Sequence, residues 1–216
     1  MRNWNRKCGI YGQMGKFDSS QNDSNSDGYS FNSTKHLKLL IQGHAQWIKR
    51  YLDQGWDGYL VTVMFNYLPG RRETKIIQMH QEVTRLYGRL ATRMVRKTWS
   101  ANRARLLPIG IFIPDLPGPK TRKALKSTIA DVSINDGLHM HGIVLGNRSG
   151  RVRVPLDQHF EEKAGQYLSR KIRHIDVQRI THTPAYVTEY ALKGLLKRTV
   201  TPDDILVLNW GGMKLG

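Results

Sequence analysis

The sequence predicts an α+β fold in which a central, largely antiparallel sheet of four to five strands is flanked by helices. Short apolar segments rich in β-branched residues, typical of buried strands, are separated by longer segments with apolar residues at helical spacing. These segments do not alternate regularly as in a parallel α/β fold, and no glycine-rich phosphate loop joins a strand to a helix. This mixture favours neighbouring strands that run antiparallel.

The N-terminal segment differs in composition from the rest of the chain. Residues 1–33 are predicted to form a basic head and a flexible polar linker, because positions 18–33 are rich in Ser, Asn and Asp. The main domain is predicted to span 34–216 and to begin with a helix over 34–52. Ser33 can cap this helix and Gly55 can end it. Its apolar residues share one face: Leu37, Leu40, Ile41, Ala45, Ile48 and Leu52.

The remaining elements follow from apolar patterning and turn residues. Strands are expected at 58–68, 106–113, 137–146, 172–180 and 204–208. Helices are expected at 71–98, 156–170 and 183–196, the last with Thr183 as its cap and Pro184 in its first turn. The loop at 114–123 is basic and rich in Pro and Gly, and residues 124–136 fit neither pattern.

The helix predicted at 71–98 carries two stripes of residues. The apolar stripe, which indicates the core-facing side, consists of Met79, Val83, Leu86, Leu90 and Met94. The second stripe is basic and consists of Arg85, Arg89, Arg93 and Arg96. Arginines at this spacing could follow a phosphate backbone as DNA-binding residues. A solvated helix surface explains the same pattern equally well.

The charge of the chain points to a polyanionic partner. Lys and Arg number 34 against 17 Asp and Glu, which gives a net charge of +17 and a pI near 10.2. Nucleic acid is the commonest partner of so basic a protein, and an anionic membrane surface is the second candidate.

The composition also indicates a compartment. The single cysteine, Cys8, excludes an internal disulfide and fits a reducing environment. The N-terminus lacks the apolar run of a signal peptide, and no stretch approaches the roughly 18 apolar residues of a membrane span. We expect a cytoplasmic protein with no membrane partner.

Two histidines in one strand form half of a candidate metal site. His139 and His141 are two residues apart, so both imidazoles project from the same face of the strand predicted at 137–146. Neutral imidazole is a common ligand of divalent metals. Asp115 is the first choice for a third ligand; the alternatives are Asp131, Asp136 and His182. Two histidines and a carboxylate suit Mn²⁺ or Mg²⁺, with zinc also possible, although a hydrogen-bonded core pair is the competing explanation.

The C-terminal helix carries a candidate nucleophile. Tyr186, Tyr190 and Lys193 have the i, i+4, i+7 spacing of one helix face. A phenol has a pKa near 10 and needs a nearby cation to stabilise its phenolate, which Lys193 could supply. An aromatic stripe packed into the core beside a surface lysine is the alternative interpretation.

The order and spacing of these motifs resembles that of the HUH endonucleases. The family carries a His-hydrophobic-His motif, followed by Tyr-x-x-Lys or Tyr-x-x-x-Tyr-x-x-Lys. Here His139-Met140-His141 and, after Tyr186, the segment Tyr190-Ala191-Leu192-Lys193 correspond to these two motifs. The strand at 58–68, with Thr62 in its middle, is similar to the family's first motif, so the resemblance covers about residues 58–196.

Two features depart from the family pattern. The acidic ligand usually lies shortly upstream of the His motif, whereas a long basic segment separates Asp115 from His139. Several two-tyrosine members carry a lysine before the second tyrosine, where this chain has Glu189.

The resemblance implies a metal-dependent nickase and strand transferase that acts on single-stranded DNA or a locally melted origin. His139, His141 and Asp115 would hold Mn²⁺ or Mg²⁺. Tyr190 would form a 5′-phosphotyrosine, Lys193 would stabilise charge, and Tyr186 would be a second nucleophile.

Within the family, we expect an initiator of rolling-circle replication of a plasmid, phage or mobile element, in a bacterial or virus-infected cell. No helicase signature is present, so a host helicase is the expected partner. A transposase or a relaxase of the same chemistry is the alternative. A basic nucleic-acid-binding module without catalysis is the alternative from another class.

Overall fold

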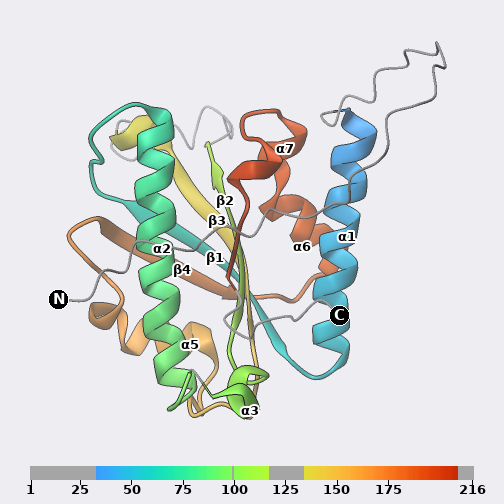
Figure 1. Cartoon of the computed structure of the whole chain (residues 1–216), viewed down its shortest axis with the longest axis vertical. Helices are drawn as coiled ribbons and strands as arrows, with labels where there is room; N and C mark the ends of the chain where they lie inside the picture. Colours follow the sequence, from blue (N-terminus) through green and yellow to red (C-terminus); the bar gives the residue numbers. More distant parts are fainter. Residues whose placement is uncertain (1–32, 99, 117–133, 209–216) are drawn as a thin grey trace, which may run out of the picture. The chain divides into compact units, whose positions relative to one another are not determined.

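The computed structural model describes residues 33–98, 100–116 and 134–208. Except for Ser33, the predicted head and linker lie outside these residues. The described chain contains a five-stranded sheet in which every neighbouring pair is antiparallel and the strand order is β4-β1-β3-β2-β5 (Figure 1). The strands are β1 (Asp57–Phe65), β2 (Ile109–Asp115), β3 (His139–Gly146), β4 (Ile172–Arg179) and β5 (Leu206–Leu208). The predicted α+β class and antiparallel sheet are confirmed.

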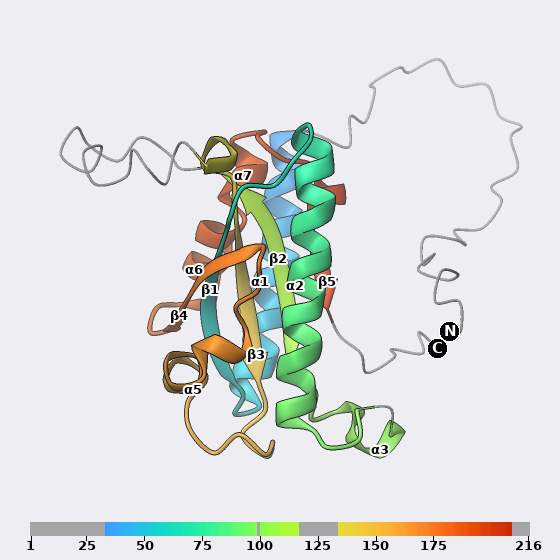
Figure 2. The ribbon, with the colours of Figure 1, turned by 90° about the vertical axis from the view of Figure 1, so that its left-hand side faces the viewer.

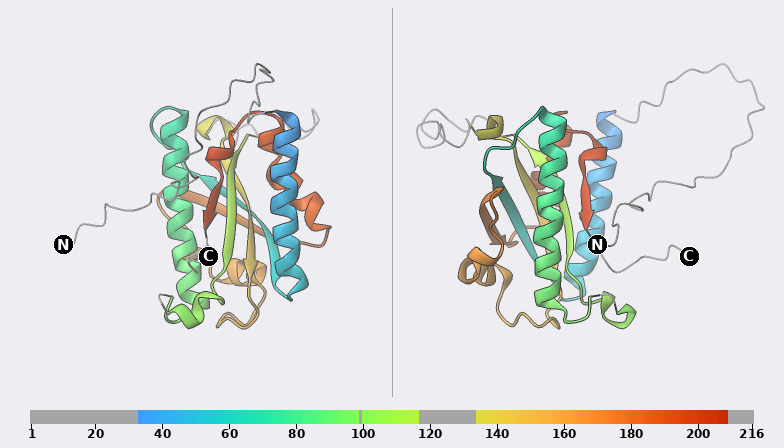
Figure 3. Two further views of the ribbon diagram at one scale, coloured as in Figure 1. Left: turned by 45° about the vertical axis from the view of Figure 1, so that its right-hand side comes forward. Right: turned by 60° about the vertical axis from the view of Figure 1, so that its left-hand side comes forward.

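Helices cover both faces of the sheet (Figure 2). Helix α2 (Arg72–Met94) packs on one face, where α5 (Leu156–Glu162) adds to the same apolar core. The other face is covered by α1 (Thr34–Asp53), α6 (Pro184–Ala191) and α7 (Lys193–Leu196). The left view of Figure 3 shows α2 and α1 on opposite sides of the strands. A short helix, α3 (Ala101–Ala104), lies between α2 and β2 in the sequence.

Side chains alternate between these two faces along each strand, as strand geometry requires. On β3, Met140 and Val144 belong to the core beneath α2, whereas Ile143 and Leu145 belong to the core beneath α1 and α6. His139 and His141 share the parity of Ile143, so they project toward the side that carries α6.

The first helix forms as predicted. The Ser33 hydroxyl accepts a hydrogen bond from the backbone N–H of His36 at 3.2 Å. This bond satisfies one of the backbone donors that are left unpaired at a helix start. Gly55 follows the helix with φ of 84°, a left-handed conformation that favours glycine. The helix buries Leu37, Ile41, Ala45 and Ile48 against the sheet.

Two predicted helices are too long. Helix α2 ends at Met94, because Val95 turns to an extended conformation and is buried in the core. All five residues of its predicted apolar stripe are buried. The helix predicted at 156–170 ends at Glu162 and is followed by a 3₁₀ turn, Ala164–Gln166. This turn returns the buried ring of Tyr167 to the core, where it packs on Phe160.

The helix predicted at 183–196 is interrupted at Leu192, which separates α6 from α7 with φ of −96° and ψ of 13°. Thr183 occupies the cap position as predicted, although its side chain makes no capping hydrogen bond. Leu192 and Leu195 are both buried, so the chain packs against the core on both sides of the break. Lys193 therefore begins a separate helix.

The predicted strands are all present, with bounds that differ by a few residues. A 3₁₀ turn, Pro202–Asp204, precedes β5. None of the helices in the described part of the chain combines the length and apolarity needed to cross a membrane.

Candidate metal and nucleophile site

The sheet register brings three predicted site residues together. Asp115, the last residue of β2, is paired with His139 at the start of β3, and Thr62 of β1 is paired with His141. Residues that are paired across neighbouring antiparallel strands project on the same face. The long segment between Asp115 and His139 does not separate them, because β2 and β3 are adjacent strands.

Three potential ligand atoms converge at this point. The Nε2 atoms of His139 and His141 are 3.1 Å apart. Asp115 Oδ2 lies 3.5 Å from His141 Nε2 and 3.8 Å from His139 Nε2. Asp115, His139 and His141 therefore form a group that could hold a metal ion.

Hydrogen bonds at Nδ1 orient both imidazoles. His139 Nδ1 lies 2.9 Å from the Gly137 carbonyl oxygen, and because a carbonyl only accepts, Nδ1 carries the proton. His141 Nδ1 lies 3.0 Å from the Thr62 hydroxyl, which can accept a proton from it in the same way. When Thr62 accepts this proton, both histidines present Nε2 lone pairs on the side of Asp115, as metal-ligating histidines do.

An unusual turn places the Gly137 carbonyl. Asn135, Asp136 and Gly137 all have positive φ, at 56°, 58° and 75°. Asn and Asp tolerate this left-handed conformation better than most residues. The buried Asn135 side chain fixes the turn, because it accepts from Leu68 N at 2.8 Å and donates to Asn66 O at 2.9 Å.

The Asp115 carboxylate is buried, and the residue is 1% exposed. Neither of its oxygens has a hydrogen-bond partner among the described residues. Its Oδ2 atom forms an ion pair with Lys193 Nζ at 2.8 Å. A buried carboxylate requires compensation by a cation or hydrogen bonds. Its second oxygen, Oδ1, receives none from the described residues.

These ligands fit a divalent metal ion. Metal–ligand bonds of about 2.0–2.2 Å place adjacent ligand atoms about 3–3.5 Å apart, near the 3.1, 3.5 and 3.8 Å that separate these three atoms. The two Nε2 atoms, 3.1 Å apart, are close enough either to share a proton or to bind one cation. Two imidazoles and one carboxylate leave coordination positions open for other oxygens.

The other candidate third ligands do not join this group. Asp136 is exposed and forms an ion pair with Lys75 at 3.2 Å. His182 is exposed, and its ring contacts Tyr186 at a centroid distance of 5.4 Å. Asp131 lies outside the described residues. Asp115, the first choice, is the acidic residue beside the two histidines.

Tyr190 lies beside the histidines, with its ring centroid 5.7 Å from that of His141. Lys193 Nζ lies 4.3 Å from the same Tyr190 centroid, a cation–π distance. One ammonium therefore contacts both the phenol ring and the Asp115 carboxylate. Helix α6 holds Tyr190 in place by packing Val187 and Ala191 into the core.

Tyr186 is arranged differently, although it lies one turn earlier on α6. Its side chain is 60% exposed. Its one ring contact among the described residues is with His182. Its role as a second nucleophile stays a prediction.

The predicted arginine stripe lies on the opposite side of the sheet, on and beyond α2. Arg85 forms an ion pair with the buried Glu82. Arg89 donates to the carbonyl oxygens of Gln166, Tyr167 and Leu168 at 3.1–3.4 Å. Arg96 follows the end of the helix.

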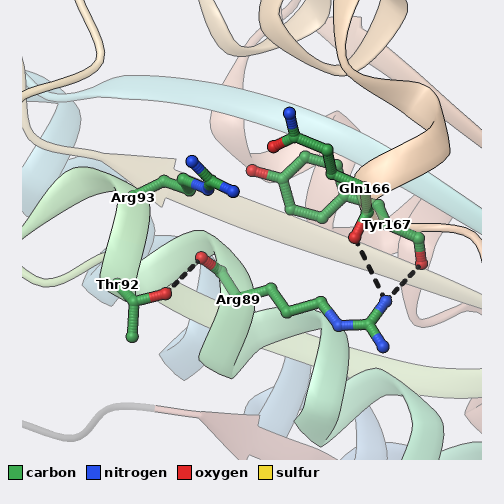
Figure 4. A pocket seen from close by; sticks show the side chains of 5 residues that line it. All are labelled: Arg89, Thr92, Arg93, Gln166 and Tyr167. Atoms are coloured by element: carbon green, nitrogen blue, oxygen red, sulfur yellow. Dashed lines mark hydrogen bonds between the residues drawn. The ribbon is translucent and has the colours of Figure 1, made fainter.

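Arg89 and Arg93 also line a pocket of about 360 Å³ together with Thr92, Gln166 and Tyr167 (Figure 4). Arg89 thus links α2 to the segment around Tyr167, whereas the Arg85 ion pair lies within α2. A DNA-binding role for the stripe stays a prediction.

The structure shows two supporting residues, Thr62 and Asn135, whose contacts the sequence does not predict. In the sequence Thr62 is only the middle residue of a strand motif, because its contact with His141 depends on the register of β1 against β3. Asn135 also supports the site, and the sequence Asn-Asp-Gly directly before the His motif is typical of a turn with positive φ.

Comparison with models of protein families, with curated proteins and with solved structures finds no match to this chain.

Proposed function

We propose that this protein is a metal-dependent endonuclease that nicks single-stranded DNA and forms a 5′-phosphotyrosine through Tyr190. The observation that carries the proposal is the position of Tyr190, with its ring against His141 and beneath the Lys193 ammonium. A candidate nucleophile, a cation and a group of metal ligands share one face of the sheet. The net charge of +17 suits a nucleic-acid substrate.

The proposed reaction is an in-line displacement at phosphorus. The Tyr190 phenolic oxygen attacks the scissile phosphate after its proton passes to water. The bond to the 3′ oxygen breaks, and this oxygen takes a proton from water to become a free 3′-OH. Lys193 stabilises the negative charge of the phenolate and the phosphate.

His139, His141 and Asp115 would hold the divalent ion, with Mn²⁺ or Mg²⁺ as the proposed cofactor. Such an ion supplies polarisation of the phosphoryl oxygens. The contacts of His141 Nδ1 with Thr62 and of His139 Nδ1 with Gly137 would keep both Nε2 atoms available as ligands.

Because the phosphotyrosine conserves the phosphodiester bond energy, a 3′-OH can attack it and rejoin a strand without ATP. This chemistry suits initiation of rolling-circle replication of a plasmid, phage or mobile element in the cytoplasm of a bacterial or virus-infected cell. The substrate would be single-stranded or locally melted, with a host helicase to unwind it. A transposase or a relaxase would use the same site.

Trapping the covalent adduct tests the proposal directly. A pool of random single-stranded oligonucleotides, labelled at the 3′ end because the tyrosine retains that fragment, is incubated with the protein and Mn²⁺. A labelled protein band should resist denaturing electrophoresis. Tyr190→Phe should abolish it, whereas Tyr67→Phe, at an exposed tyrosine in the β1–α2 loop, should not.

A non-catalytic basic DNA-binding module is the competing function. Such a module would form a salt-sensitive complex and no adduct with any metal. The double variant His139→Ala/His141→Ala separates the two, because the proposed enzyme should still bind DNA and lose nicking. Normal nicking by this variant would contradict the metal assignment.

A further inference from the structure

Tyr186 and His182 form an exposed aromatic pair at the start of α6. The Tyr186 side chain is 60% exposed, and the two rings meet edge to face at a centroid distance of 5.4 Å and an interplanar angle of 64°. A tyrosine left this exposed contributes little to folding, since burying an aromatic ring is what stabilises a core.

The surroundings of Tyr186 differ from those of Tyr190. Lys193 lies over the Tyr190 ring, and His141 lies beside it. Within the described ranges, no hydrogen bond or cation–π contact joins Tyr186 to a lysine or an arginine. A phenol is a weak nucleophile without a neighbouring cation or base. We therefore expect the ring of Tyr186 to bind a ligand, and we do not expect its hydroxyl to act as a nucleophile.

The position of the pair relates it to the reacting centre. Tyr186 and Tyr190 are four residues apart on one helix, so their Cβ atoms are about 5–6 Å apart on the same face. A strand whose phosphate lies at Tyr190 would therefore pass Tyr186 with an adjacent nucleotide.

We propose that Tyr186, supported by His182, is a stacking surface for an unpaired base of single-stranded DNA next to the scissile phosphate. This inference rests on the proposed function, because it places the scissile phosphate at Tyr190. Aromatic side chains bind bases of any sequence through their faces, and a basic protein surface attracts the backbone. The ring is required for this role and the hydroxyl is not.

Binding without nicking provides the test. Affinity for a thymidine oligonucleotide of about 12 nucleotides, and for an abasic oligonucleotide of the same length and charge, is measured by fluorescence anisotropy in EDTA. Wild type and Tyr186→Phe should both prefer the thymidine strand. Tyr186→Ala should bind that strand about five- to hundredfold more weakly, and should lose most of the preference. Ile77→Ala, at an exposed residue of α2 on the other face of the sheet, is the control and should bind as wild type does.

Two results would overturn the inference. Tyr186→Ala could bind both oligonucleotides as wild type does, in which case no base stacks on this ring. Alternatively, peptide mapping could find the DNA adduct on Tyr186, which would make its hydroxyl a nucleophile. The absence of any adduct with Mn²⁺ would contradict the proposed function. The affinities measured in EDTA would still test base stacking on Tyr186, because they require no nicking.

Discussion

Lys193 Nζ lies 2.8 Å from Asp115 Oδ2, so the first residue of α7 is paired with the last residue of β2. The carboxylate is buried, and the same ammonium contacts the Tyr190 ring. A single cation thereby links the candidate metal ligands to the candidate nucleophile. The break at Leu192 lets Lys193 start a new helix beside Asp115.

Replacing Lys193 should strengthen metal binding while weakening nicking. The ammonium is a positive charge beside a ligand oxygen, and unit charges about 4 Å apart interact by about 1 kcal/mol even at the dielectric constant of water. Lys193→Met should therefore raise Mn²⁺ affinity by about fivefold or more in calorimetric titration. The control is Lys197→Met, which removes an equal charge from an exposed residue one turn later. If both substitutions change Mn²⁺ affinity equally, the effect comes from the overall charge of the protein and not from the Lys193–Asp115 ion pair.

Thr62→Val should weaken metal binding without disturbing the fold. Valine keeps the shape of threonine in a strand but cannot accept a hydrogen bond from His141 Nδ1. Loss of such an outer hydrogen bond typically costs about 10–100-fold in metal affinity. Mn²⁺ titration measures the effect, and thermal unfolding in EDTA checks the fold.

Thr84→Val is the matched control for Thr62→Val. The Thr84 hydroxyl donates to the His80 carbonyl on α2, on the other face of the sheet. This substitution should leave Mn²⁺ affinity unchanged. If Thr62→Val also leaves it unchanged, the Thr62 hydroxyl does not orient the metal ligand.

The sequence predicts which residues form the site better than it predicts which of them contact one another. The spacing of His139 and His141 identifies a shared strand face, since strand periodicity is a local property. The pairing of Asp115 with His139 depends on which strands are neighbours, which the long segment between them obscured. The contact of Thr62 with His141 likewise depends on register, which periodicity alone does not specify.

Helix periodicity had a similar limit. It identified the buried stripe of α2 and placed the arginines beside it, but it did not indicate which face of the sheet α2 covers. The break at Leu192 is not predicted, because apolar residues at helical spacing favour a continuous helix through this segment.

Gly142→Ala should destabilise the strand that carries the histidines. A Cβ atom at this position would lie 2.2 Å from Phe112 Cδ1 and 2.7 Å from the backbone oxygen of Ile111. Such overpacking typically costs about 1–3 kcal/mol of the free energy of unfolding. Urea denaturation measures it.

The control is Gly88→Ala in α2, where a Cβ would meet no atom within 4 Å. Alanine there should stabilise the protein by about 0.5–1 kcal/mol through its higher helix propensity. Destabilisation of similar size by both substitutions would contradict the packing of Phe112 against Gly142.

Acidification below the ordinary histidine range should destabilise the fold, in part through His159. The buried His159 Nε2 lies 2.7 Å from the Tyr167 hydroxyl. Burial raises the pKa of Tyr167 to about 12, so this hydroxyl stays protonated and can donate to a neutral His159. Burial, with a smaller contribution from Arg93, lowers the pKa of His159 below its ordinary value of 6.5. Burial also lowers the pKa of His44 and that of His80.

The direction of the pH effect follows from these pKa values. Above about pH 6.5 the folded and unfolded chains both hold neutral His159, and its full contribution to stability is present. As pH falls below that value, the unfolded chain binds a proton first and folding becomes less favourable, until the folded-state pKa is passed. Urea denaturation in EDTA between pH 8 and pH 5 should show this loss. His159→Gln should reduce the slope by at most about 1.4 kcal/mol per pH unit. His174→Gln, at an exposed residue of β4, should reduce it less, and an equal reduction would contradict the role of burial at His159.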